Sequence, residues 1–199
     1  MTTIYQELTG TDQPELILNK NELNCHKGFN DMVARTENFH ILYELLVQSG
    51  MHWWLMFGTL LGAVREKDFI KWDADTDLSL PVTDKSKFVV FLREAIKKGF
   101  KVIRSQANDE LVSIARKGEY IDFYFWAERK DYMEMCGLRI DKEHFKTLDT
   151  LDFLGHKCNV PYNYILLLVR LYGDWQIPKR DFTASREINY AGGKTYYEH

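Results

Sequence analysis

The sequence predicts an α+β fold, because it contains both strand and helix patterns and does not alternate them one by one. Hydrophobic residues make up 45% and charged residues 28% of its 199 residues, a balance typical of a globular protein. A chain of this length buries roughly 70% of its unfolded surface, so its core needs no disulfides. We expect a single domain over residues 1–199, with an N-terminal extension at 1–28 and a C-terminal tail at 179–199.

Helices are predicted where apolar residues recur at a spacing of three and four. The three clearest helices cover residues 32–50, 83–99 and 161–172. The first two end in a glycine suited to a helix C-terminus, and the third has a proline at its first turn. Runs of apolar residues, or their alternation with polar ones, predict strands at residues 52–57, 75–80, 100–105, 111–116, 120–126 and 132–140.

Charge and cysteine content limit the class of partner and the compartment. With 26 Lys and Arg against 29 Asp and Glu, the net charge of −3 predicts no nucleic-acid partner. Three cysteines, an odd number, favour a reduced compartment over a disulfide scaffold. The N-terminus lacks a secretory signal pattern, and the longest apolar run, Ile165–Val169, is too short to cross a membrane. We expect a soluble, cytoplasmic protein without a transmembrane segment.

Two carboxylates of the strand at 75–80 indicate a metal site. Asp75 and Asp77 are two residues apart, so a strand places both on one face. Close carboxylates repel each other unless a cation neutralises them, and hard oxygen ligands favour Mg²⁺ or Mn²⁺. A solvated acidic edge is the alternative, but the flanking residues are apolar. We expect Asp75 and Asp77 to bind the metal ion, with Asp73 and Trp72 in supporting positions.

Asp122 is the only charged residue in the apolar and aromatic strand YIDFYFW, which spans residues 120–126. An acid in such a strand is rarely buried without a partner. It is either satisfied by hydrogen bonds or by a basic neighbour, Arg116 or Lys117, or it lies beside the other two acids and completes a three-carboxylate metal site. We expect the second arrangement, with Lys117 in a supporting position.

The segment after the strand at 52–57 contains features of a phosphate site. Gly58 and Thr59 break the strand before a short helical turn, and glycine lets a ligand approach the N–H groups at a helix start. Arg65, one turn later, and Lys71 are candidate partners for phosphate oxygens. A plain strand-to-helix turn and a surface arginine are the structural alternatives.

These motifs carry a resemblance to a known family. A Gly-Thr turn, a short helix, Asp75-Thr76-Asp77-Leu78 and a lone acid in a later strand resemble the polymerase-beta type of nucleotidyltransferase. The longer string GTLLGAVREKDFIKWDADTDLSL resembles the signature of the LicD/fukutin family, as do YIDFYFW and the element from Leu171 to Pro178. The resemblance covers about residues 40–180. It implies a nucleotidyltransferase-like mixed β-sheet flanked by helices.

The resemblance also implies an activity. Members of the family move a phosphoalcohol group from a CDP-alcohol donor to a glycan hydroxyl, as in lipopolysaccharide or capsule biosynthesis. Phosphocholine from CDP-choline is the bacterial example, and ribitol phosphate from CDP-ribitol is the fukutin example. Asp75, Asp77 and Asp122 would be the catalytic, metal-binding residues, with Asp122 either a ligand of a second ion or the base for the attacking hydroxyl. A lipid-linked acceptor would bring the enzyme transiently to the inner leaflet of a membrane.

Other interpretations remain open at this stage. A nucleotidyltransferase that transfers the nucleotide itself to a small molecule needs the same carboxylates. A third possibility is a family member that binds no metal and only binds nucleotides or partner proteins. Without a metal ion, however, carboxylates that repel each other at close range are unfavourable. Trp53, Trp54 and Trp72 could form a cage for a quaternary ammonium group, or they are core. The chain also contains cysteines and histidines, which can bind zinc, but their spacing matches no standard zinc motif. They are Cys136, His144, His156 and Cys158.

Overall fold

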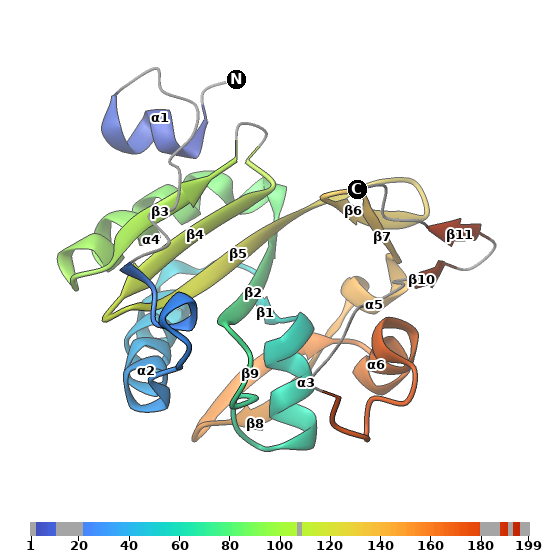
Figure 1. Cartoon of the computed structure of the whole chain (residues 1–199). Helices are drawn as coiled ribbons and strands as arrows, with labels where there is room; N and C mark the ends of the chain where they lie inside the picture. Colours follow the sequence, from blue (N-terminus) through green and yellow to red (C-terminus); the bar gives the residue numbers. More distant parts are fainter. Residues whose placement is uncertain (1–2, 11–21, 107–108, 180–187, 191–192, 196–199) are drawn as a thin grey trace.

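A seven-stranded mixed sheet forms the centre of the molecule in the computed structural model, which describes residues 3–10, 22–106, 109–179, 188–190 and 193–195 (Figure 1). Five strands lie in the order β1-β2-β5-β4-β3, and β6 and β7 extend the sheet from the far end of β5. Only β2 and β5 pair in parallel. The strands are β1 (Trp54–Leu55), β2 (Asp75–Pro81), β3 (Lys101–Ser105), β4 (Leu111–Arg116), β5 (Glu119–Glu128), β6 (Tyr132–Met135) and β7 (Leu138–Asp141).

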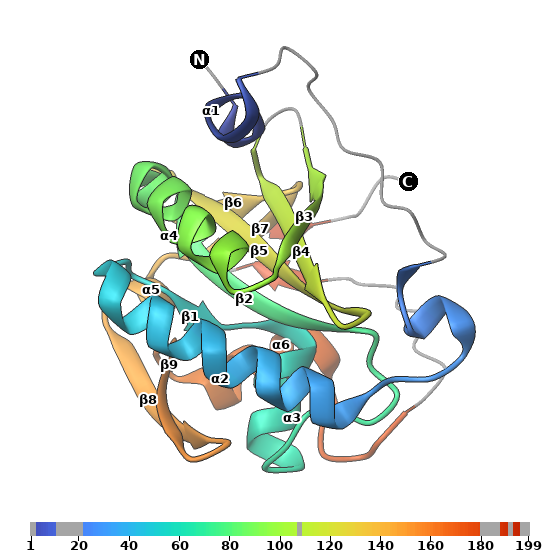
Figure 2. The ribbon, with the colours of Figure 1, turned by 90° about the vertical axis from the view of Figure 1, so that its left-hand side faces the viewer.

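Two helices cover one face of this sheet, as Figure 2 shows: α2 (Met32–Ser49) and α4 (Lys85–Lys97). Alternation along β5 directs Ile121, Phe123 and Phe125 to this face. The Phe88 ring of α4 lies 4.9 Å from the rings of Phe123 and Phe125, measured between centroids. The covered face therefore holds the main hydrophobic core. The short helix α1 (Ile4–Thr9) packs against α4, and two 3-10 turns are η2 (Cys25–Lys27) and η3 (Val82–Asp84).

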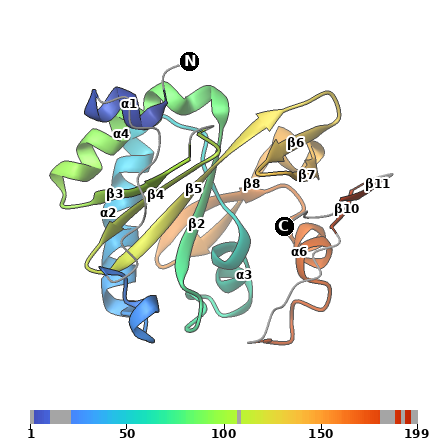
Figure 3. The same cartoon turned by 45° about the horizontal axis from the view of Figure 1, so that its top comes forward.

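The remaining elements pack around the sheet, and the hairpin at 148–161 lies against α2, where the Phe39 and Phe153 ring centroids are 5.1 Å apart. Figure 3 shows α6 and the β6–β7 hairpin on the side of the molecule opposite α2. They share a second hydrophobic cluster that includes Trp126, Leu138 and Leu167. These elements are α3 (Phe57–Arg65), α5 (Glu143–Lys146), β8 (Leu148–Phe153), β9 (His156–Pro161), α6 (Tyr164–Tyr172), β10 (Ile188–Tyr190) and β11 (Gly193–Thr195).

The structure confirms the α+β class, with a mixed sheet flanked by helices, and corrects three elements. The strand expected at 132–140 is a hairpin, because Cys136 and Gly137 turn the chain with φ values of 47° and 77°. The strand expected at 52–57 has two paired residues, since α3 already begins at Phe57. Pro161 ends β9 and does not start α6, because an unexpected hairpin occupies 148–161.

The expected N-terminal extension contributes to the fold in its described part. Ile4 is buried, and its N–H donates to the Asp109 carboxylate at 3.0 Å. Leu23 is buried as well, and the N–H of Asn24 donates to the carbonyl oxygen of Gly118 at 2.9 Å. Over the described part of the chain, no helix combines the length and apolar character that crossing a membrane requires.

Candidate active site

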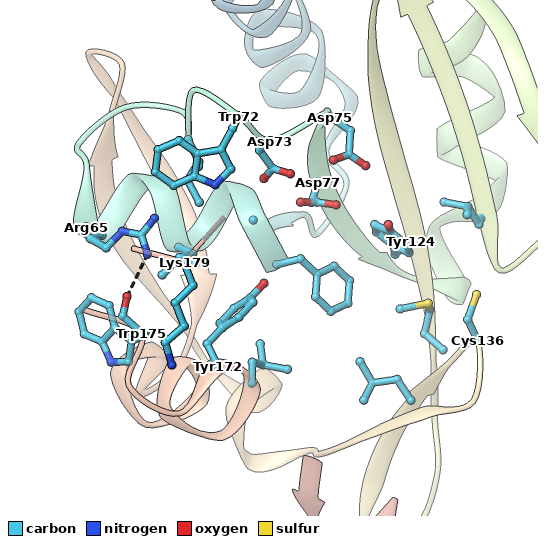
Figure 4. A pocket seen from close by; sticks show the side chains of 18 of the residues that line it. Arg65, Trp72, Asp73, Asp75, Asp77, Tyr124, Cys136, Tyr172, Trp175 and Lys179 are labelled. Carbon is cyan, nitrogen blue, oxygen red and sulfur yellow. Dashed lines mark hydrogen bonds between the residues drawn. The ribbon is translucent and has the colours of Figure 1, made fainter. Parts of the chain in front are cut away.

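A cavity of about 550 Å³ opens beside the polar face of the sheet (Figure 4). Its walls come from β2 and α3 on one side, and from α6 and the loop after it on the other. Phe57, Tyr124 and the β6–β7 hairpin close the remaining side. The cavity therefore lies where several separate segments of the chain meet, as substrate sites commonly do.

Three carboxylates line this cavity at the start of β2. Asp75 and Asp77 share one face of the strand, as their spacing predicted. Asp73 lies in the preceding turn, where its N–H donates to the carbonyl oxygen of Ile70 and its own carbonyl accepts from Asn30 Nδ2 at 2.8 Å. One oxygen from each carboxylate lies within 4.8 Å of the others. Figure 4 shows the three acids side by side, an arrangement in which all three can bind one metal ion.

The start of α3 fits closely against these acids. A Cβ added to Gly58 would lie 1.9 Å from Asp73 Oδ2 and 3.2 Å from Asp77 Oδ2, so only glycine fits there. The N–H of Thr59 donates to Asp77 Oδ2 at 3.3 Å, and the N–H of Asp77 donates to Thr59 Oγ1 at 2.7 Å. Both residues were expected to contact phosphate. In this structure Thr59 is buried and holds Asp77 in place, while Gly58 lines the cavity.

Burial raises the pKa of all three acids, and repulsion between carboxylates adds to this at Asp75 and Asp77. Burial is the main cause at Asp75, and the charges of Asp122 and Asp73 add to it, so that its pKa rises to about 7. The pKa of Asp77 rises well above its usual range, because it is buried and faces Asp75 and Asp73. Burial also raises the pKa of Asp73, although the charge of Arg35 opposes this. Carboxylates in such a cluster gain strongly from a bound cation.

Asp122 lies beside Asp77 but has partners of its own. In the parallel pairing of β2 and β5, Asp122 is opposite Asp77. Its carboxylate accepts from Ser113 Oγ at 2.5 Å, from Arg104 Nη2 at 2.6 Å and from the Tyr124 hydroxyl at 3.3 Å. The described group with metal-binding geometry contains Asp73 and does not contain Asp122. The basic neighbour of Asp122 is thus Arg104, whereas Arg116 and Lys117, named as candidates, pair with Glu37. The role of Asp122 in metal binding stays a prediction.

Two cations line the cavity across from the acids. The side chain of Arg65 donates from Nη1 to the carbonyl oxygen of Trp175 at 3.0 Å and from Nε to Glu66 at 2.8 Å. Figure 4 shows Lys179 beside Arg65, with Trp72 and Trp175 on the same side. Of the other two predicted cations, Lys117 pairs with Glu37 of α2. Neither Lys117 nor Lys71, both described residues, is among those that line the cavity.

The alternative sites do not assemble in this structure. Trp53 and Trp54 are buried in the core, so only Trp72 of the three tryptophans lines the cavity. His156 forms a hydrogen bond with His40, whereas His144 contacts the carbonyl oxygen of Tyr162. Within the described residues, the one group of three potential metal-binding acids, histidines or cysteines consists of the acids on and before β2.

Sequence reasoning missed two residues of the site and underrated a third. Lys179 was assigned to the tail, and no motif marks it as a cavity residue. Tyr124 belongs to the strand with Asp122, and period-two alternation would have placed both on the same face. Asp73 was expected to support the ligands, yet its carboxylate belongs to the cluster. Its acidic side chain was the available signal, because spacing alone does not reveal the turn at Ile70.

Comparison with known proteins identifies the family and agrees with the fold. The family model described as LicD/FKTN/FKRP, nucleotidyltransferase domain, matches residues 50–163, which include Asp73, Asp75, Asp77 and Asp122. The chain is 26% identical over 180 residues to ribitol 5-phosphate transferase FKRP of Mus musculus. The match covers 80% of this chain and 35% of that protein, so the chain spans about a third of its relative's length.

Two solved structures share the fold at low sequence identity. The antibiotic-resistance factor ANT(2'')-Ia, in its solution structure, has a TM-score of 0.51 and 11% identity, covering 75% of this chain and 79% of its own. The lincosamide antibiotic adenylyltransferase LnuA, with lincomycin bound, has a TM-score of 0.51 and 10% identity, covering 73% and 90% of the two chains. These likenesses confirm the expected nucleotidyltransferase-like fold.

Proposed function

This chain belongs to the LicD/FKTN/FKRP family of nucleotidyltransferase domains, and we propose that it is a metal-dependent transferase of phosphoalcohol groups. Its donor is a CDP-alcohol, and its acceptor is a hydroxyl group of a glycan. The observation that carries the proposal is the cluster of Asp73, Asp75 and Asp77 facing two cations across one cavity. Acids for a metal ion and cations for phosphate oxygens are the parts that phosphoryl transfer requires.

The residues present fit a divalent metal ion. Three carboxylates lie within 4.8 Å of one another and are raised in pKa, and Gly58 leaves the space that their oxygens occupy. Oxygen donors of this kind suit Mg²⁺ or Mn²⁺. We assign the ion to Asp73, Asp75 and Asp77, with Asp122 as the predicted additional ligand. Once bound, such an ion neutralises the developing negative charge on the transferred phosphoryl group.

The other residues of the cavity bind and orient the substrates. Arg65 is held by Trp175 and Glu66, so its guanidinium is fixed at the cavity wall, where it can donate to a phosphate oxygen. Lys179 adds a second positive charge on the same side. In this proposal the diphosphate of the donor lies between these cations and the acids. Its position aligns the phosphorus atom nearest the alcohol for attack.

Asp122 and Tyr124 are positioned for the acceptor. Arg104 and Ser113 fix the Asp122 carboxylate beside the acid cluster. If Asp122 does not bind metal, it accepts the proton of the attacking hydroxyl. Burial and the nearby acids raise the pKa of Tyr124 far above its usual value, so the phenol stays protonated and donates. The transfer then forms a phosphodiester with the glycan and releases CMP.

A donor screen tests this proposal. Purified protein with Mg²⁺ or Mn²⁺ is incubated with CDP-choline, CDP-ribitol or CDP-glycerol, and CMP release is measured with and without glycan acceptors. We expect metal-dependent CMP release from one of the CDP-alcohols. The Asp77→Asn variant should be inactive, and Asp152→Asn, which changes an exposed acid paired with Lys157, should match the wild type.

The same assay includes the competing nucleotidyltransferase activity. CTP and ATP are offered with small hydroxylated acceptors, and pyrophosphate is measured. Pyrophosphate release from a triphosphate, with no CMP from any CDP-alcohol, would contradict the proposed reaction and favour transfer of the nucleotide itself. Both activities require the acid cluster, so inactivity of Asp77→Asn does not distinguish them and only the released product does.

A further inference from the structure

Apolar side chains form a patch on the outer side of α6 and on the segments beside it. We define the α6 patch as five residues that each expose between 40 and 57% of their surface: Tyr162, Ile165, Leu166, Val169 and Ile177. The opposite stripe of α6, with Leu167, Leu168 and Leu171, is buried. Eight of the nine α6 residues are apolar or aromatic, so this helix is apolar on its outer side as well. A surface helix of a globular domain normally has a polar outer side.

We propose that the α6 patch binds the surface of an anionic lipid bilayer. The described residues 161–179 contain two cations, Arg170 and Lys179, and one acid, Asp174. This segment therefore has a net charge of +1, whereas the whole chain has −3. Positive charge next to exposed apolar side chains is the combination that holds an amphipathic segment at a membrane surface.

Aromatic residues around the patch also favour a lipid bilayer as its binding partner. Tyr162 lies in the patch, and Tyr164, Tyr172 and Trp175 are partly exposed beside it. Tyrosine and tryptophan favour the headgroup region of a bilayer, because their rings are apolar and their polar ends hydrogen-bond to water. The apolar side chains would enter the boundary with the acyl chains, and Arg170 would lie at the level of the lipid phosphates.

The α6 patch adjoins the cavity, so a bilayer bound at the patch would lie close to the candidate active site. Ile177 of the patch lines the cavity, as do Tyr172 and Lys179 from the same part of the chain. A bilayer bound at the α6 patch would therefore lie beside the opening of the cavity. If the proposed transferase activity holds, the contact brings the site to acceptors that are anchored in the membrane. Binding to the bilayer does not depend on that activity.

Flotation with lipid vesicles tests the proposal without any turnover. The full chain is mixed with vesicles of phosphatidylcholine alone or with added phosphatidylglycerol, at low and at physiological ionic strength. The wild type should float with the anionic vesicles, less so at higher salt. Val169→Glu should lower the partition coefficient by about tenfold or more, because an apolar contact is replaced by a negative charge. Leu166→Gln, which adds no charge, should lower it by less.

The control is Val90→Glu, which places the same charge at a 59% exposed valine on α4. It should bind vesicles as the wild type does, and circular dichroism should show all three variants folded. The proposal is wrong if the wild type does not float, or if Val169→Glu floats as well as Val90→Glu. Sedimentation velocity on the same samples identifies the main competitor: a wild-type dimer that Val169→Glu dissociates would make the patch a self-association surface and overturn membrane binding.

Discussion

Single residues determine whether the acid cluster can bind a metal ion. Asp77 is the most constrained of them, because it is buried, bonded to Thr59 in both directions and opposite Asp122. Its high pKa shows that ionising it without a cation is unfavourable. The neighbouring carboxylates repel Asp77 when they are ionised, and the fold holds them together despite this repulsion.

The first prediction concerns Asp77→Asn. Turnover should fall by roughly three orders of magnitude or more, as when a group that stabilises transition-state charge is lost. Melting without metal should occur at an equal or slightly higher temperature, because the substitution removes repulsion between carboxylates. The rise in melting temperature that Mn²⁺ gives the wild type should vanish. Unchanged metal-induced stabilisation in the variant would contradict the assignment of Asp77 as a ligand.

The second prediction concerns Gly58→Ala. The new methyl group meets Asp73 Oδ2 at 1.9 Å, so the Asp73 side chain must move out of the cluster. We expect metal affinity, measured by thermal shift with Mn²⁺, to fall by about tenfold or more. Gly137→Ala is the control: its Cβ meets no atom within 4 Å, but its φ of +77° makes the variant less stable by about 1 kcal/mol. Equal metal affinities in both variants would show that Asp73 is not a ligand.

At the scale of elements, four neighbouring strands bring a row of polar side chains together. Asp77 on β2 lies opposite Asp122 on β5, Asp122 opposite Ser113 on β4, and Ser113 opposite Arg104 on β3. All four project from the face that α2 and α4 leave uncovered. The row positions Asp122 through the sheet itself, with Arg104 as its cation.

The third prediction tests that row. Arg104→Met leaves the buried Asp122 without its cation, so the free energy of unfolding should fall by about 1–3 kcal/mol. Turnover should fall as well, because Asp122 loses its fixed orientation. The control Arg139→Met removes an exposed ion pair with Glu134 and should cost about 0–1 kcal/mol. Chemical denaturation measures both. If Arg104→Met is no less stable than Arg139→Met, the row does not support Asp122.

Most helices and strands were predictable from periodicity, and the exceptions have physical reasons. The strand at 111–116 and the helix at 32–50 lie where their patterns predict them, although the helix buries Arg35 and exposes Val33. The hairpin of β8 and β9 was missed, because polar residues on both of its faces weaken the alternation. Asp75 and Asp77 could be placed on one face by counting alone. Arg104 could not be identified as the partner of Asp122, since strand order is a tertiary property.

At the scale of the whole molecule, ionisation of the acid cluster affects stability. Without metal, the fold is less stable at pH values at which the cluster is ionised. Asp75 has a pKa of about 7 in the folded chain and an ordinary value of 3.8. The folded state therefore keeps a proton that the unfolded state releases. The contribution of that proton to stability is complete below the unfolded pKa and is lost as the pH rises through about 7.

The fourth prediction follows from this linkage. Without metal, the melting temperature should fall as the pH rises from about 5 to about 8, and the fall should be smaller in Asp75→Asn. With excess Mn²⁺, the wild type should instead gain stability over the same interval, because the ion displaces the protons. Calorimetry in matched buffers measures both trends. A wild type whose metal-free melting temperature falls no more steeply with pH than that of Asp75→Asn would contradict the raised pKa.

The most direct test of the metal site is a crystal structure of the protein with Mn²⁺, using anomalous scattering to locate the ion. We predict an anomalous peak beside β2, with oxygens of Asp75 and Asp77 at about 2.1–2.3 Å and Asp73 in contact. A peak that also lies within bonding distance of Asp122 would assign that residue as a ligand, and a more distant one would leave it as the base. No peak at these acids at a saturating Mn²⁺ concentration, or a peak elsewhere with the three carboxylates unliganded, would contradict the account.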